Sequence, residues 1–521
     1  MANKLPDKNS AVMQVALSEN RLELTITEHK GSGSMKKVNG FSAVTVALTL
    51  MLVGCGGGGG GSGGGGGDAA PGASVDPEGD GSQQDDSSGP ESLKVLTPTV
   101  MDKVTIDAAV FRPDVAISDD GKALAVWAEE VNETLRLVAV EGNAEEGTWS
   151  SKTFLDDGQG LYAPNEAWLT TQVTMDASGN GVIGWMQSVE GSEIPHLKTI
   201  FYSPESGFDS PVDHGQTRAF ILQGNDAGDA LIMWEMEFAP SKQDIAAALR
   251  PSGSTTWAPK QNLTDGEVTE EYASSLALNF SRLSMNEAGE AILLYRGVGP
   301  AVDNKTAKLY VLSLDISASW VGPEAILAGS EIENLTHFAA AISDTGVRFA
   351  GWSENDSESY QAFGVTMDAA LEQGSRVSYM DTVENPLIRL AATYREDDSL
   401  FMAAETQLNS LHPLVTNEVT ESGSDPQGYA YGGRFLTLAS DGIRVIALGR
   451  NNCATGMGVR ESNEQGILMS EPECSEGNAK ENIELAITPQ RAGVFAGIGS
   501  IRDESTFPAI RQDVIELTFF R

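Results

Sequence analysis

Cysteine and positive charge are both scarce in this chain. Among 521 residues there are three cysteines, and 34 Lys and Arg stand against 74 Asp and Glu, which gives a formal net charge of −40. A strongly negative surface repels phosphate backbones and anionic lipid headgroups. The composition therefore excludes nucleic acid as a partner and argues against charge-driven binding to anionic lipid.

Calcium-loop spacing is missing too. Asp76-Pro-Glu-Gly-Asp80 begins like such a loop, but its twelfth position is Ser87 instead of Glu. We therefore interpret the acidity as a source of solubility, with the capture of metal ions as the weaker alternative.

Common catalytic and cofactor motifs are also absent from the sequence. It holds no Gly-x-Ser-x-Gly elbow. The glycine run at 56–67 lacks the preceding strand and following helix of a nucleotide-binding loop. The histidines at 196, 214, 337 and 412 stand alone and form no His-Glu-x-x-His or His-x-His pair. We predict no catalytic residue, no metal site and no cofactor, although loops of separate repeats could still bring isolated residues together.

No hydrophobic run is long enough to span a bilayer. The longest, Phe41–Val53, has thirteen residues. It follows Met35-Lys-Lys and ends in Leu52-Val-Gly-Cys55, which closely resembles the lipobox of bacterial lipoproteins. The resemblance implies a signal peptide at 35–54 and a lipid, including palmitate, on Cys55 as the mature N-terminus. The alternative is a membrane or buried segment with a chance cysteine.

The lipoprotein resemblance has two further implications. A signal that starts at Met35 makes residues 1–34 an upstream extension, outside the native mature protein. Gly56 follows the cysteine where the family uses Asp for inner-membrane retention. The resemblance therefore implies the outer membrane of a Gram-negative bacterium, on its periplasmic or cell-surface face.

Residues 55–92 are predicted to be a disordered tether. After Cys55 come eleven glycines and one serine, and then seven acidic residues with no basic one. Such a segment cannot bury a core. The formal charge divides into zero for 1–34, +2 for 35–54, −7 for 55–92 and −35 for 93–521, so most of the acidity belongs to the last part.

Two cysteines remain after the lipidation site. Cys453 and Cys474 lie 21 residues apart in the predicted folded part. In an oxidising envelope a single pair is typical of a disulfide. The alternative is a metal or catalytic thiol, but no histidine lies near either cysteine in the sequence.

A β-hairpin pattern organises the rest of the chain. Val115–Trp127 holds a short apolar run, a polar turn ending at Gly121, and a second apolar run. Its second run is apolar on both faces, which indicates a strand covered on both sides. Equivalent glycines stand at 121, 179, 228, 289, 346, 442 and 493. An aromatic residue follows six positions later in five copies, as Trp127, Trp185, Trp234, Tyr295 and Trp352.

Further features recur beside each hairpin in the sequence. Ser, Asp or Asn opens most turns, where its side chain can accept a backbone N–H two residues on. A degenerate eighth copy occupies Ile388–Thr406, with Arg395-Glu-Asp-Asp398 as its turn. A third alternating run, such as Leu135–Val140, follows the hairpin. Outer-strand positions are then expected at Trp149, Phe208, Trp257 and Trp320.

This period predicts an all-β fold of four-stranded antiparallel blades over residues 93–521. We predict an eight-bladed β-propeller, or a seven-bladed one if a weak copy is loop. The pattern resembles the sialidase-like repeat propellers of bacterial surface proteins. Those carry an Asp box with Trp three residues after the Gly, whereas here the Trp comes six residues after it. We further predict that Val514–Phe520 pairs with an N-terminal strand, Lys94–Val100 or Val104–Val110.

We expect a lipid-anchored, non-enzymatic binding or scaffolding module for an envelope protein or polysaccharide. The alternatives are a polysaccharide-active enzyme, by analogy with sialidase-like propellers, or an envelope-assembly factor. The repeated tryptophans are expected to pack between blades. Trp168 breaks the repeat in a loop and is the candidate ligand contact.

Overall fold

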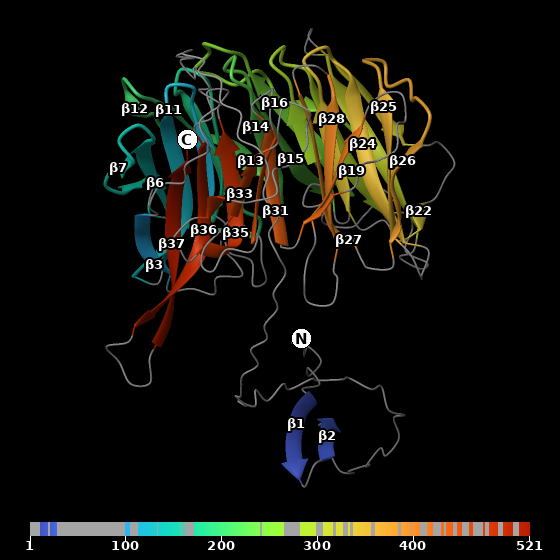
Figure 1. Cartoon of the computed structure of the whole chain (residues 1–521). Helices are drawn as coiled ribbons and strands as arrows, with labels where there is room; N and C mark the ends of the chain where they lie inside the picture. Colours follow the sequence, from blue (N-terminus) through green and yellow to red (C-terminus); the bar gives the residue numbers. More distant parts are fainter. Residues whose placement is uncertain are drawn as a thin grey trace, which may run out of the picture. The chain divides into compact units, whose positions relative to one another are not determined.

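The protein is described from a computed structural model of the whole chain (Figure 1). The structure describes residues 11–18, 21–28, 99–104, 113–161 (without 133, 157 and 159), 171–239, 242–264, 282–298, 306–315, 319–326, 332–333, 337–355, 360–383, 387–395, 398–406, 414–419, 429–431, 434–440, 445–450, 458–461, 473–474, 479–487, 493–503 and 510–520. The chain divides into two compact units, Met1–Asp85 and Asp86–Arg521.

The described residues of the first unit form one hairpin. Strand β1 (Ala11–Ser18) pairs antiparallel with β2 (Arg21–Glu28), from Ala11 opposite Glu28 to Ser18 opposite Arg21. Apolar and polar residues alternate along β2, which is the period of a strand. The predicted lipidation site Cys55, the signal and the tether lie outside the described residues.

The second unit is all-β, and its described residues form eight antiparallel sheets and no helix. We number the sheets in chain order. Sheets one to four comprise β4 (Asp114–Ile117), β5 (Lys122–Val131), β6 (Thr134–Asn143), β7 (Thr148–Trp149) and β8 (Thr153–Phe154); β9 (Thr171–Met175), β10 (Gly181–Gln187), β11 (His196–Ser203), β12 (Gly207–Phe208) and β13 (Val212–Gln216); β14 (Phe220–Gly224), β15 (Ala230–Ala239), β16 (Lys242–Arg250) and β17 (Gln261–Asn262); and β18 (Arg282–Met285), β19 (Ala291–Val298), β20 (Thr306–Leu314), β21 (Trp320–Ala325) and β22 (Ile332–Glu333).

The remaining four sheets have four strands each. They comprise β23 (Phe338–Ile342), β24 (Arg348–Asn355), β25 (Tyr360–Met367) and β26 (Val377–Val383); β27 (Leu387–Tyr394), β28 (Leu400–Thr406), β29 (Leu414–Val419) and β30 (Tyr429–Tyr431); β31 (Arg434–Ser440), β32 (Val445–Arg450), β33 (Gly458–Glu461) and β34 (Glu473–Cys474); and β35 (Ala479–Ile487), β36 (Gly493–Asp503), β37 (Ile510–Phe520) and β3 (Thr99–Val104). The prediction of repeated four-stranded antiparallel units is confirmed. The degenerate copy at 388–406 forms the first two strands of the four-stranded sheet β27–β30.

The predicted role of the turn glycines is confirmed where the turns are described. Gly121 and Gly346 have φ angles of 75° and 85°, a region that a residue without Cβ enters freely. The degenerate turn has no glycine, and Asp398 adopts a φ of 60° in its place. Asp and Asn are the residues that tolerate this conformation best after Gly. In both turn types the positive-φ residue donates its N–H to the carbonyl three residues before it, as Gly121 does to Ser118 and Asp398 to Arg395.

The prediction that the polar residue opening a turn accepts an N–H two residues on is confirmed at Asp176, which accepts the Ser178 N–H at 2.9 Å. In other turns the bond reaches further along the chain. Asn225 and Asn286 accept the N–H of Asp229 and Glu290, four residues on, at 2.8 and 2.9 Å. The reason is that residues i and i+4 face each other across the turn, as the bond from the Asn225 N–H to the Asp229 carbonyl shows.

The repeated aromatic residues form the core. Trp127, Trp185, Trp234, Tyr295 and Trp352 are each at most 2% exposed. Each packs against residues of the preceding sheet: Trp185, for example, contacts the cluster containing Val126 and Ala128. The interpretation of these aromatics as packing residues is confirmed.

Neighbouring sheets meet along their first strands. β4, β9, β14, β18, β23, β27, β31 and β35 contact one another in this order, and β35 also contacts β4. In the last sheet the outer strand comes from the N-terminal side, because β3 pairs antiparallel with β37 from Thr99 opposite Leu517 to Val104 opposite Asp513. The predicted pairing of the two chain ends is confirmed, at Thr99–Val104, which overlaps both candidate segments. Figure 1 shows β3 beside β37.

Candidate functional site on the hairpin turns

Polar side chains gather on the turns between the first two strands of each sheet. We define the turn face as the turns at 118–122, 176–180, 225–229, 286–290, 343–347 and 395–399. These turns bond to one another across sheet boundaries. The Ala177 N–H donates to the Asp226 carbonyl at 3.1 Å. At the other end, the Thr345 hydroxyl lies 3.0 Å from both carboxylate oxygens of Asp398.

Asparagine makes the central links of the turn face. The side-chain carbonyl oxygen of each asparagine accepts a backbone N–H of its own turn, and the side-chain NH2 group donates to a carbonyl of the next turn. The amide of Asn225 donates to the Asn286 carbonyl at 2.9 Å, and the amide of Asn286 donates to the Ser343 carbonyl at 2.9 Å. A side chain with both donors and an acceptor can satisfy two turns at once. The turns of sheets three, four and five are thereby fixed relative to one another.

Carboxylates stand at or next to the residues that open these turns. Across the first five sheets these acids are Asp119, Asp176, Asp226, Glu287 and Asp344. The Glu287 carboxylate accepts the N–H groups of Asp226 and Ala227 at 3.3 and 3.1 Å. The acids of sheets one to five therefore lie close together, although they are far apart in the sequence.

The carboxylates repel one another. The pKa of Asp226 is raised to about 6 by desolvation and by the charges of Glu287, Asp119 and Asp176. Desolvation, with the charges of Asp344 and Asp119, also raises the pKa of Glu287, against the hydrogen bonds from the Asp226 and Ala227 N–H groups. Both residues are exposed to solvent. The turn face thus carries like charge that a positively charged partner would neutralise.

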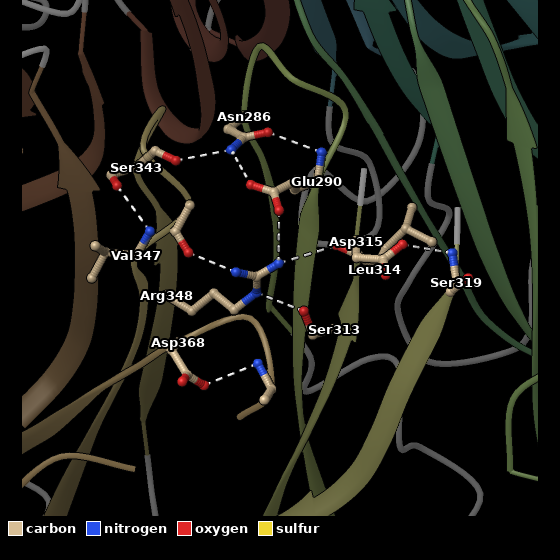
Figure 2. Close-up of polar contacts among 12 residues, drawn as sticks. Asn286, Glu290, Ser313, Leu314, Asp315, Ser319, Ser343, Val347, Arg348 and Asp368 are labelled. Carbon is tan, nitrogen blue, oxygen red and sulfur yellow. Dashed lines mark hydrogen bonds and ion pairs between the residues drawn. The ribbon is translucent and has the colours of Figure 1, made fainter. Parts of the chain in front are cut away.

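The guanidinium of Arg348 lies beneath this face. Arg348 is fully buried, and its Nη2 lies 3.3 Å from Glu290 Oε1. It also donates to the hydroxyl of Ser313, at 2.6 Å, and to the carbonyls of Gly346 and Leu314. Figure 2 shows Arg348 directed at Glu290, which also bonds Asn286. Arg348 therefore joins sheet four to sheet five.

The predicted site residues do not meet here. Trp168 and Cys453 lie outside the described residues, so the ligand contact and the disulfide remain predictions. Cys474 ends β34, and no disulfide is found within the described ranges. Those ranges also contain no group of three or more His, Cys, Asp or Glu residues placed to hold a metal ion. They form no helix, and hence none that could cross a membrane.

Sequence reasoning missed the turn-face carboxylates as a cluster. It treated the polar turn positions as hairpin residues only. The available signal was the acidic residue at the same turn position in four of the first five copies, as Asp119, Asp226, Glu287 and Asp344.

No protein-family model and no curated protein sequence matches this chain. Solved structures with a similar fold include the β-propeller domain of the Trilobed protease from Pyrococcus furiosus, at 10% identity over 71% of this chain and 98% of that chain, with a TM-score of 0.42. Another is the α-L-arabinofuranosidase Arb93A from Fusarium graminearum, at 12% identity over 63% and 99%, with a TM-score of 0.37. The polysaccharide lyase Uly1 is similar at 11% identity over 70% and 93%, with a TM-score of 0.41. The activities in these names belong to those proteins.

Proposed function

We propose that this protein is a lipid-anchored β-propeller of eight blades in the cell envelope that acts as a non-enzymatic binding or scaffolding module. Its binding surface is the turn face, and its partner is a positively charged segment of an envelope protein. The observation that carries this proposal is the mutual repulsion of the clustered turn-face carboxylates. Desolvation is the largest cause that raises the pKa of Asp226 to about 6, and the charges of Glu287, Asp119 and Asp176 add to it. A cationic partner relieves that repulsion, so binding and ionisation of Asp226 favour each other.

The turn face is suited to binding because its parts are fixed. The Asn225 and Asn286 amides connect successive turns, so the carboxylates keep their spacing before a partner arrives. Preorganised groups lose little conformational entropy on binding. The eight-bladed arrangement is supported by the contacts between successive first strands, which return from β35 to β4. The anchor is supported by the lipobox-like sequence that ends at Cys55.

The test is capture of a partner from a detergent extract of the native envelope. The protein is used as bait, and salt is raised to screen non-specific attraction to its negative surface. A D226N/E287Q variant removes two charges from the turn face. The matched control, E190Q/E193Q, removes two exposed charges from the loop between β10 and β11, at the other end of sheet two.

We expect one stoichiometric partner that wild type and the control retain and D226N/E287Q loses. Capture by wild type should strengthen as the pH rises through about 6, where Asp226 ionises. Equal capture of the partner by D226N/E287Q and E190Q/E193Q would show that the turn face is not the binding surface. If the wild-type bait captures no partner, the adaptor role is contradicted.

A further inference from the structure

The edge between sheets two and three contains a histidine inside an aromatic contact. His214 lies on β13 of sheet two. Its ring centroid is 5.5 Å from that of Trp234 on β15 and 5.4 Å from that of Trp257, which follows β16. Both tryptophans belong to sheet three. The imidazole therefore stands at the boundary between the two sheets, and it is partly buried.

Thr199 on β11 connects these side chains. The indole N–H of Trp257 donates to the Thr199 hydroxyl oxygen at 3.0 Å. The same hydroxyl lies 2.9 Å from Nε2 of His214. Because the oxygen already accepts the indole proton, its own O–H is free to donate to a neutral His214 Nε2. This assigns the neutral imidazole with its proton on Nδ1, and a directed chain from Trp257 through Thr199 to His214.

Protonation of His214 reverses the last bond of that chain. Nε2 becomes a donor, and the Thr199 hydroxyl oxygen then faces two N–H donors. Its own proton loses the acceptor it had, and Thr199 is fully buried. A buried hydroxyl without an acceptor costs about 1–3 kcal/mol.

The surroundings favour the neutral imidazole. Burial lowers the pKa of His214 to about 4, against a smaller opposing effect of the adjacent Asp213 carboxylate. Asp213 is itself held by Lys198 and His196 on β11, at 2.9 and 3.1 Å. Two charged residues of sheet three lie near this edge. Arg250 stands over the Phe201 ring at 4.7 Å, and Lys260 contacts Met236, which packs against the cluster containing Trp234.

We propose that Trp257, Thr199 and His214 form an acid-sensitive clasp between sheets two and three. At neutral pH the hydrogen-bond chain holds the segment after β16 against β11. When His214 binds a proton, the chain breaks, Trp257 separates from Thr199, and the edge of sheet three loosens while the sheets themselves persist. This clasp is independent of the turn face and of the proposed binding function.

The first measurement is the titration of the five histidines by NMR in the full chain, together with tryptophan fluorescence and far-UV circular dichroism between pH 7.5 and 3.5. We expect one histidine with a midpoint near pH 4 that is missing in H214Q. A reversible fluorescence change should share this midpoint, be absent in H214Q and W257F, and precede any loss of circular dichroism.

Two further variants keep the test decisive. H196Q removes the neighbouring histidine, which contacts Asp213 but not Thr199, and should leave the transition unchanged. T199V keeps the side-chain shape but removes the hydroxyl. It should shift the NMR titration midpoint of His214 upward by roughly 0.5–1 pH unit, because the neutral imidazole loses the hydrogen-bond donor that stabilises it. A fluorescence transition that persists in H214Q, or that coincides with global unfolding, would overturn the clasp.

Discussion

At the residue scale, like-charge repulsion on the turn face is concentrated at Asp226. Its folded-state pKa of about 6 lies above its ordinary value of 3.8. Between these two pH values the folded state binds more protons than the unfolded state. The contribution of Asp226 to stability is therefore fully present below about pH 4 and is lost as the pH rises through 6. His214 has the opposite sign, because its folded-state pKa is lowered and its contribution is lost as the pH falls from 6.5 towards 4.

We predict that D226N stabilises the protein at pH 7.5 and changes little at pH 4. Without screening, the rise in the pKa of Asp226 corresponds to about 3 kcal/mol in the free energy of unfolding. Solvent screens this exposed carboxylate, so the expected gain is roughly 1 kcal/mol or less. Urea unfolding at both pH values measures the difference. D209N, which removes an exposed carboxylate away from this cluster, should stay within about 0.5 kcal/mol of wild type at both. A D226N protein that is less stable at pH 7.5 would contradict the repulsion.

At the element scale, Arg348 sets sheets four and five apart from their neighbours. The residue two positions after the turn glycine is Ala123, Ala230 or Ala291 in other copies, and these are fully or almost fully buried. At the same position Arg348 reaches across to Glu290 and Ser313 of sheet four. A buried guanidinium is tolerated there because acceptors surround it.

We predict that R348M lowers the free energy of unfolding by about 3 kcal/mol, since it leaves the Glu290 carboxylate without its ion-pair partner and removes the guanidinium donor from two carbonyls. Thermal or urea unfolding measures this loss. E290Q/R348M should cost less than the sum of the two single variants, because the second change removes the unpaired charge. K122M, which breaks an exposed ion pair with Asp120, is the control and should cost less than about 1 kcal/mol. If the losses of stability of E290Q and R348M add up in the double variant, the Arg348–Glu290 ion pair does not connect sheets four and five.

At the scale of the whole unit, the N-terminal strand completes the last sheet. β3 occupies the outer edge of β37 through five register pairs, and Met101 packs against the cluster that contains Ile515 and Leu517. The first residues of the unit thus close a sheet whose other strands come from its last residues. Stability of this sheet depends on both chain ends.

We predict that a chain reduced to residues 106–521 unfolds at lower denaturant concentration than one reduced to 93–521. The loss should be at least about 2 kcal/mol, from the side chain of Met101 and the ladder hydrogen bonds of β3. Both chains lack the tether, so only β3 differs between them. Equal stability would mean that the pairing of β3 adds nothing to the fold.

Much of this architecture follows from the sequence. The turn glycines predict the hairpins, because a tight turn needs a positive φ that Gly adopts without strain. The alternation of Val514–Phe520, which has few strand partners in its own repeat, predicts closure by an N-terminal strand, and β3 confirms it. The aromatic residues six positions after each glycine predict the packing between sheets. These are local signals, repeated within short stretches of chain.

The turn face and the clasp were decided by tertiary structure alone. Asp226 lies about sixty residues from Glu287 by the numbering, and their side chains interact only because successive first strands stand side by side. His214, Thr199 and Trp257 belong to three segments on two sheets. Trp257 is expected on an outer strand but lies between β16 and β17, and no sequence pattern connects it with the other two. A sequence pattern reports which residues share a strand or a turn. Electrostatic repulsion, desolvation and hydrogen bonding depend on distances across sheets, and those distances exist only once the sheets have packed.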